Sequence, residues 1–146
     1  MSTLYGRNYD EVYNDNGKVS PGEYNGHKKV MFEDYTFAAE ASSADTLKLG
    51  KLPKGARVLS CTLKSPDLGG TGTIDVGTQA NGTESADQDG FIAAADASGQ
   101  AVQQAGSGAN IGVKFSAETV VQAYFSGATG SATGKTIKVW IEYIVD

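Results

Sequence analysis

Few side chains in this sequence could carry acid–base, nucleophilic or metal chemistry. There is one histidine, His27, and one cysteine, Cys61. A serine or cysteine nucleophile needs a base that an orienting carboxylate holds in place, and no second histidine offers an alternative to His27. One cysteine and one histidine are too few for a zinc site. We interpret His27 as a solvated side chain, and Cys61, which lies in a strand pattern, as a small buried hydrophobe.

The acidic residues that stand close together in the sequence match no catalytic or metal-binding pattern. Glu33 and Asp34 are adjacent, so in a strand they point to opposite faces and cannot act on one bond. Asp87 and Asp89 belong to the run DQDG, which resembles half of a calcium loop but lacks its third acidic position and its distal Glu. We expect a solvated loop there. The sequence therefore predicts no enzyme, no metal and no cofactor; a lyase or hydrolase would need two carboxylates that the fold brings together.

Two glycine-rich segments share features with phosphate-binding loops. Residues 69–72 (GGTG) and 127–130 (GATG) are not followed by the Lys-Ser/Thr pair or the helix that such a loop requires. Residues 134–136 (GKT) match the end of that motif, but they open a strand pattern. We interpret the first two segments as tight turns and the third as a chance match.

The aromatic residues point to binding instead. Trp140 faces away from the apolar row of the last predicted strand, and Ile144 shares its side. One interpretation is that the tyrosine-rich N-terminal segment, residues 1–28, or a loop covers Trp140. The second is an oligomer or docking surface formed by Tyr124, Trp140 and Ile144, because aromatic residues are enriched at interfaces. The third is a carbohydrate platform, for which Tyr124 is the evident companion.

Residues 1–28 differ in composition from the rest and form our first predicted region. They hold four of the seven tyrosines, Tyr5, Tyr9, Tyr13 and Tyr24, among Asn-Gly turn dipeptides, and show no strand or helix period. One interpretation is a frayed terminus. The other is an extended N-terminal arm that orders against a partner, with the tyrosines as anchors. The segment lacks the apolar stretch of a signal peptide.

From residue 29 to residue 146 the hydrophobic period is two, which predicts strands. Pro53 and Gly55 break the pattern between two of them. Val30 and Phe32 share one parity, and Tyr35 and Phe37 share the other. A bulge near Glu33 and Asp34 would keep both pairs inward. Residues 91–95 are a strand or a helical turn in the otherwise irregular stretch 78–110. The expected strands cover residues 30–37, 46–49, 56–64, 73–77, 111–115, 118–126 and 137–145. This count predicts an all-β domain, an antiparallel β-sandwich that is jelly-roll-like.

Charge and hydropathy exclude two classes of partner. The chain has 12 basic and 17 acidic residues, a net charge of −5. Without a basic cluster we expect no nucleic acid partner, because phosphate contacts need Lys and Arg. No apolar run is long enough to cross a bilayer, so we expect no membrane partner. A single cysteine favours synthesis in a reducing cytosol.

Five segments in order resemble motifs of small tailed-phage virion proteins. Residues 52–59 (LPKGARVL) are similar to an LPxGAxVL step, and residues 71–77 (TGTIDVG) to an xTxxVG strand. Residues 89–95 (DGFIAAA) resemble a D-x-F-I/L-A-A loop. Residues 119–123 and 139–143 resemble the closing strands of those proteins. The similarity covers about Thr46 to Val145. In these segments the chain resembles the head decoration, or capsid cement, proteins of tailed phages.

This resemblance implies a function as well as a fold. Members of the family are jelly-roll-like, often trimeric, and sit on an icosahedral capsid. The expectation is therefore a homotrimeric bacteriophage decoration protein whose partner is the major capsid protein. It would be made in the host cytoplasm and located on the virion surface. The alternative is a carbohydrate- or receptor-binding module of a phage fibre or tail, because the arm and Trp140 lie outside the family pattern.

Overall fold

The computed structural model describes residues 27–145, which form eight β-strands. In chain order they are β1 (Lys29–Thr36), β2 (Thr46–Leu52), β3 (Ala56–Ser65), β4 (Ile74–Thr78), β5 (Asp87–Ala95), β6 (Val102–Ala105), β7 (Thr119–Phe125) and β8 (Thr136–Val145). This part of the chain has no helix that is long and apolar enough to cross a membrane. The predicted arm, residues 1–28, lies outside the described residues except for His27 and Lys28.

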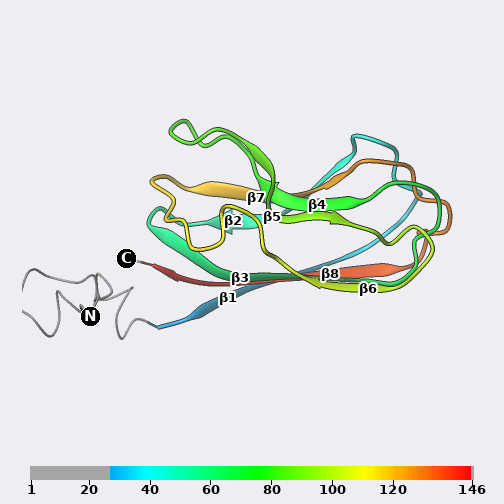
Figure 1. The fold of residues 1–146 in the computed structure, drawn as a ribbon, viewed down its shortest axis with the longest axis horizontal. Coiled ribbons are helices and arrows are strands. Elements are labelled where there is room, and N and C mark those ends of the chain that lie inside the picture. The colour runs from blue at the N-terminus through cyan, green and yellow to red at the C-terminus, as the bar shows by residue number, and fades with distance from the viewer. Residues whose placement is uncertain (1–26, 146) are drawn as a thin grey trace, which may run out of the picture.

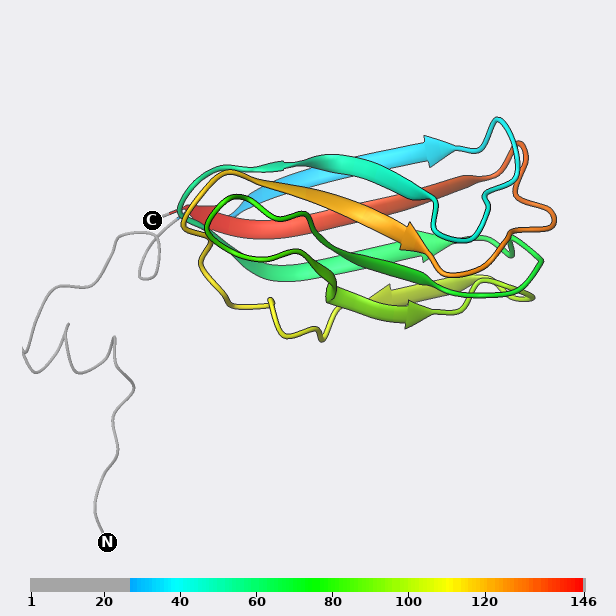
Figure 2. The same ribbon diagram turned by 90° about the horizontal axis from the view of Figure 1, so that it is seen from above.

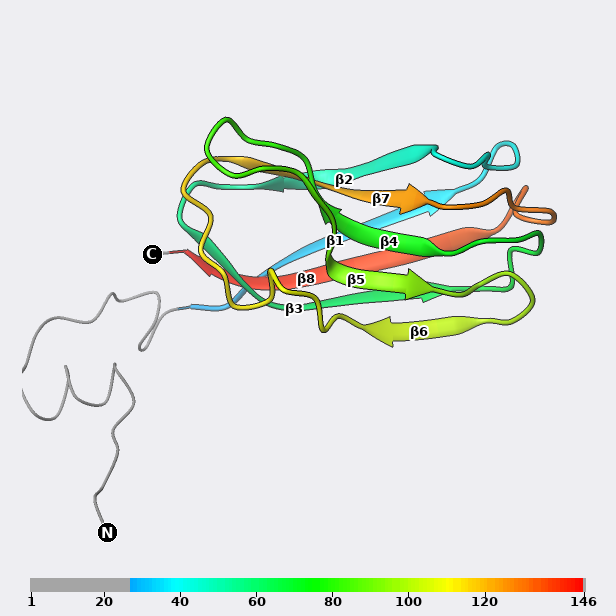
Figure 3. The same ribbon diagram turned by 45° about the horizontal axis from the view of Figure 1, so that its top comes forward.

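The strands form two four-stranded antiparallel sheets packed face to face (Figures 1 and 3). Their orders are β1-β8-β3-β6 and β2-β7-β4-β5. Each sheet alternates early and late strands, which is the arrangement of an eight-stranded jelly roll. The start of β1 and the end of β8 lie at the same end of the sandwich (Figure 2). The predicted all-β antiparallel sandwich is confirmed.

The core lies between the sheets and follows the period of two. In β8, Ile137, Val139 and Ile141 point inward and are almost fully buried. Phe91 and Phe115 meet edge to face with their ring centroids 6.2 Å apart, a favourable geometry for buried aromatic rings. Cys61 is fully buried, as predicted, and desolvation raises its pKa to about 12. Its thiol is therefore protonated and unreactive at neutral pH.

Strand β1 differs from the sequence prediction. Its register with β8 runs without interruption from Lys29 opposite Tyr143 to Thr36 opposite Thr136, so the bulge predicted near Glu33 is absent. The alternation therefore places Val30 and Phe32 outside, with 59% and 56% of their surfaces exposed. The strand pairs along one edge only, and nothing in its regular ladder reverses the faces.

The stretch 78–110 contains two strands. Residues 91–95 belong to β5, and β6 follows at Val102–Ala105. The strand predicted at residues 111–115 is wrong, because this segment is a loop with a single bridge between Arg57 and Lys114. Gly112 has a φ of 86°, a conformation outside the β region. The turn predicted after β2 is confirmed, with Gly55 at a φ of 86°.

The two glycine-rich segments pack against each other at one end of the sandwich. The amide of Thr71 donates to the carbonyl of Ala128 at 3.0 Å. A Cβ on Gly127 would lie 2.1 Å from the Thr71 carbonyl oxygen, so only glycine permits this approach. Nearby, the Glu40 carboxylate accepts hydrogen bonds from the Thr129 hydroxyl and from the amides of residues 132 and 133, which lower its pKa to about 2. The two glycine-rich segments are therefore turns that join strands.

Candidate docking surface

The outer side of the β1-β8-β3-β6 sheet carries the most exposed apolar side chains among the described residues. We call it the Trp140 face. The strand register arranges its side chains in three rows across β1, β8 and β3. The rows are Val30, Glu142 and Ser60; then Phe32, Trp140 and Thr62; then Asp34, Lys138 and Lys64.

Phe32 and Trp140 form an aromatic pair in the middle row. Their ring centroids are 6.5 Å apart and their planes differ by 17°. They are directly opposite in the register of β1 and β8, where cross-strand side chains make contact. Val30 extends this apolar area along the edge strand. Exposed apolar side chains on an edge strand, as Val30 and Phe32 are on β1, are a typical site of association.

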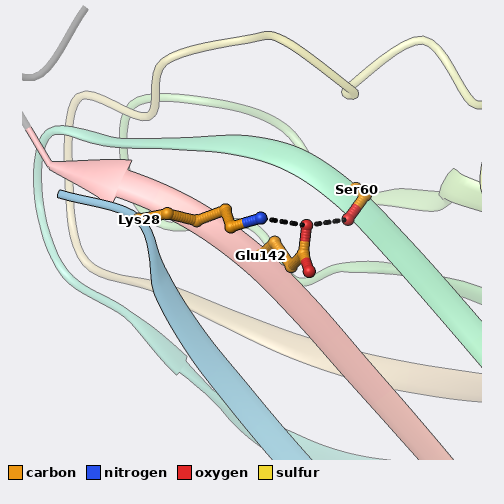
Figure 4. Close-up of polar contacts among 3 residues, drawn as sticks. All are labelled: Lys28, Ser60 and Glu142. Atoms are coloured by element: carbon orange, nitrogen blue, oxygen red, sulfur yellow. Dashed lines mark hydrogen bonds and ion pairs between the residues drawn. The ribbon is translucent and has the colours of Figure 1, made fainter. Parts of the chain in front are cut away.

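A polar cluster borders the aromatic pair at the end where β1 begins. The Lys28 ammonium lies 3.3 Å from a carboxylate oxygen of Glu142, and the Ser60 hydroxyl donates to the same oxygen at 3.1 Å (Figure 4). The hydrogen bond from Lys28, the hydrogen bond from Ser60 and the charge of Lys28 lower the pKa of Glu142. The carboxylate is thus ionised at neutral pH and forms part of a polar rim.

Lys64 and Lys138 face each other in the third row. Both are exposed, and Asp34 stands opposite Lys138 on its other side. The sequence analysis did not predict this pair, because Lys64 and Lys138 are brought opposite each other only by the register of β3 and β8, two strands that are distant in the chain.

Tyr124 does not belong to the Trp140 face. It lies on β7 in the other sheet and points away from the core, which its neighbours Ala123 and Phe125 enter. Its hydroxyl donates to the Thr78 carbonyl at 3.3 Å. The predicted surface of Tyr124, Trp140 and Ile144 is therefore split between the two opposite outer faces of the sandwich.

Ile144 lies on the same side of β8 as Trp140, but only 8% of its surface is exposed. It therefore offers little contact area to a partner. The tyrosines of the predicted arm, Tyr5, Tyr9, Tyr13 and Tyr24, lie outside the described residues. The residue that the sequence interpretation missed is Phe32, which strict alternation along β1 would have placed outside with Val30.

The described residues offer little for catalysis. Asp87 and Asp89 stand at the start of β5, not in a loop. Desolvation and then Asp89 raise the pKa of Asp87. Within residues 27–145 no three His, Cys, Asp or Glu side chains gather in a way that could hold a metal ion. His27 is exposed. The arrangement on the Trp140 face suits binding.

The fold is shared with solved protein structures. A chain of the cyanophage Pam1 capsid asymmetric unit matches with a TM-score of 0.64 and 20% identity, over 83% of this chain and 86% of that chain. A chain of the capsid of Ralstonia phage GP4 matches with a TM-score of 0.66 and 24% identity, over 83% and 86%. A chain of the acidic stable capsid of Helicobacter pylori bacteriophage KHP30 matches with a TM-score of 0.54 and 17% identity, over 81% and 87%.

All three structures are phage capsids. At these sequence identities the matches show a common fold, and they extend over more than four fifths of each chain. No protein-family model and no curated protein matches the sequence.

Proposed function

We propose that this chain is a virion structural protein that decorates and stabilises an icosahedral phage capsid. The observation that carries the proposal is the fold it shares with chains of three phage capsids over most of their length. The motifs between Thr46 and Val145 that resemble head decoration proteins favour a decoration role over a shell-forming one. The stacked pair of the exposed Phe32 and the half-buried Trp140 supports a protein that works through contact.

The proposed mechanism is cross-linking of the shell. A homotrimer binds where subunits of the major capsid protein meet, so each copy bridges neighbours. Anything that binds the assembled shell and not its separated parts stabilises the shell by mass action. Three linked copies gain further through their effective concentration. The Trp140 face supplies desolvated aromatic contacts, the kind that dominates interface energies, and the arm with Tyr5, Tyr9, Tyr13 and Tyr24 extends the contact.

The direct test uses empty shells of the cognate phage that lack this protein. Purified full-length chain is added, the bound copies per shell are counted, and the temperature of shell disruption is measured. We expect saturable binding and a higher disruption temperature. Absence of binding to assembled shells would contradict the decoration role.

The arm and the trimer are tested with a variant that lacks residues 1–28. Light scattering of both forms is expected to give the mass of a trimer, with the sandwich as the self-assembling unit. Shell occupancy of the shortened form is expected to fall. Unchanged occupancy would remove the arm from the docking mechanism, and a monomer in both forms would restrict assembly to the capsid surface.

A second candidate function is carbohydrate or receptor binding by a fibre or tail module. One observation favours it, since Phe32 supplies the exposed aromatic companion of Trp140 that a sugar platform needs. This module would bind a glycan array, would lose that binding in Trp140→Ala, and would have no affinity for shells. The shell experiment therefore separates the two functions.

A further inference from the structure

A groove lies beside the aromatic pair, at the end of the Trp140 face where β8 begins. It has a volume of about 560 Å³ and is open on one side. Its lining combines apolar carbons of the segments after β3 and before β6 with polar groups of β3, β6 and β8. The lining residues are Lys64, Ser65, Pro66, Ala101, Val102, Gln103, Thr136 and Lys138.

Two positive charges define the chemistry of this groove. Lys64 and Lys138 are directly opposite in the antiparallel register of β3 and β8, and both line the groove. Like charges at directly opposite positions destabilise a sheet. Within residues 27–145 neither ammonium lies in an ion pair, although Asp34 is the next residue across from Lys138. The described sheet therefore bears an unfavourable charge pair that an anion placed between the two lysines would relieve.

The surroundings indicate which anion fits. Pro66 and Val102 give the groove an apolar wall, while Thr136 and Gln103 offer hydroxyl and amide groups. An extended peptide with acidic side chains matches this combination, because it supplies carboxylates, aliphatic carbons and backbone polar groups together. A nucleic acid matches it less well, because a phosphate backbone carries a charge at every nucleotide and is bound by a larger cluster of basic residues than the two lysines of this groove.

We propose that the groove of Lys64 and Lys138 binds an acidic, extended segment of a protein partner, with a carboxylate held between the two ammonium groups. The partner is a capsid subunit if the proposed function holds, and only that identity rests on it. Phe32 and Trp140 lie in the adjacent row of the same face, so apolar side chains that flank the acidic residues reach the aromatic pair.

The test titrates fluorescein-labelled hexaglutamate with the full-length chain and follows anisotropy at low ionic strength. The double variant Lys64→Glu with Lys138→Glu is expected to weaken binding by at least about tenfold, because two attractive charges become repulsive. Lys48→Glu with Lys54→Glu is the matched control, since both lysines are exposed and outside the groove and the net charge changes equally. Equal losses in both double variants would overturn the proposal.

A single variant guards against misfolding. Lys64→Glu places a carboxylate opposite Lys138 of β8, and the residue opposite it on the other side, Gln103 of β6, is uncharged. Repulsion is replaced with attraction, so the midpoint of thermal unfolding is expected to stay the same or rise while hexaglutamate binding falls. Unchanged hexaglutamate binding would overturn the proposal. So would an oligothymidylate that binds more tightly than hexaglutamate and loses its binding in the same variant, because this assigns the groove to phosphate.

The shell assay separates this proposal from the proposed function. If hexaglutamate does not bind while the wild-type chain still occupies shells, the groove proposal fails and the decoration role stands. If the chain binds hexaglutamate but does not bind shells, the groove proposal stands and the decoration role fails.

Discussion

The two outer faces of the sandwich differ in where their side chains find partners. On the β2-β7-β4-β5 sheet, Gln79 donates to Gln122 at 2.8 Å, and Gln122 is only 4% exposed. Asp75 accepts from the Gln88 side chain and from the amide of residue 94. The loop between β4 and β5 rises on this side of the molecule (Figure 1). This face is largely satisfied by its own chain.

The Trp140 face is arranged differently. Phe32, which stacks on the half-buried Trp140, stays open to solvent on the outside, and Lys64 faces Lys138. Both arrangements cost stability in an isolated chain, because apolar surface stays in water and like charges stand opposite. This difference is one reason for our proposal that a partner contacts the Trp140 face.

The largest effect is expected when the aromatic pair is removed. Phe32→Ala with Trp140→Ala should weaken shell binding by more than about a hundredfold, about 3 kcal/mol, because exposed aromatic anchors dominate interface energies. Tyr124→Ala on the opposite face should leave binding within about twofold. Binding is measured as shell occupancy against concentration of added chain. A larger loss in Tyr124→Ala than in the double variant would reverse the assignment of the two faces.

The next effect concerns the stability of the outer face of the β2-β7-β4-β5 sheet, which we call the self-covered face. Gly77 lies opposite Gln122, and a Cβ there would meet the Asp87 carbonyl oxygen at 2.0 Å. Gly77→Ala should lower the free energy of unfolding by roughly 2–3 kcal/mol, as overpacking against backbone does. Thr62→Ala on the Trp140 face is the control and should change it by less than about 1 kcal/mol. Urea denaturation measures both, and equal losses would show that the two faces are equally covered.

The sequence predicted most strands because their inward residues alternate with polar ones, as in β8 and β7. It missed β6, whose residues Val102–Ala105 form a short, polar edge strand with no apolar period. It also misplaced Phe32, because four large apolar residues near the start of the domain were all assumed to be buried. Single-chain patterns do not show that an edge strand can leave two of them outside.

The candidate surface was harder to predict than the fold. Parity placed Trp140 opposite the apolar row of β8 correctly, but it could not tell which sheet each strand would join. Tyr124 and Trp140 both point away from the core in their own strands, yet they lie on opposite sides of the molecule because β7 and β8 belong to different sheets. Likewise, the meeting of Lys64 with Lys138 depends on a register between β3 and β8 that includes an irregularity between Val58 and Ser60. Local periodicity carries no information on either.

A smaller effect is expected for a buried hydrogen bond of the self-covered face. Gln79→Ala removes the donor to Gln122 and leaves its side-chain oxygen buried without that bond. The free energy of unfolding should fall by about 1–2 kcal/mol, with shell binding unchanged. Gln103→Ala on the Trp140 face is the exposed counterpart and should change stability by less than about 0.5 kcal/mol. If Gln103→Ala costs as much as Gln79→Ala, the contrast in internal hydrogen bonding fails.

The smallest effect is expected at the polar rim of the Trp140 face. Lys28 is the largest cause of the lowered pKa of Glu142, so Lys28→Met should move that pKa upward, and the Ser60 hydrogen bond should keep part of the shift. A lowered carboxylate pKa stabilises the fold above the ordinary glutamate pKa, and this contribution is lost as the pH falls through the lowered value. The Lys28 side chain is 54% exposed and that of Glu142 is 34% exposed, so solvent screens the pair.

Nuclear magnetic resonance titration of the Glu142 carboxyl carbon measures this shift directly, with Lys29→Met as the neighbouring control. The urea midpoint at neutral pH should be unchanged in both variants. If instead Lys28→Met unfolds the protein at neutral pH, the contact of Lys28 with Glu142 would be needed to hold the start of β1 in the sheet. The Trp140 face would then depend on its own polar contacts, as the self-covered face does, and the contrast between the two faces would be weaker.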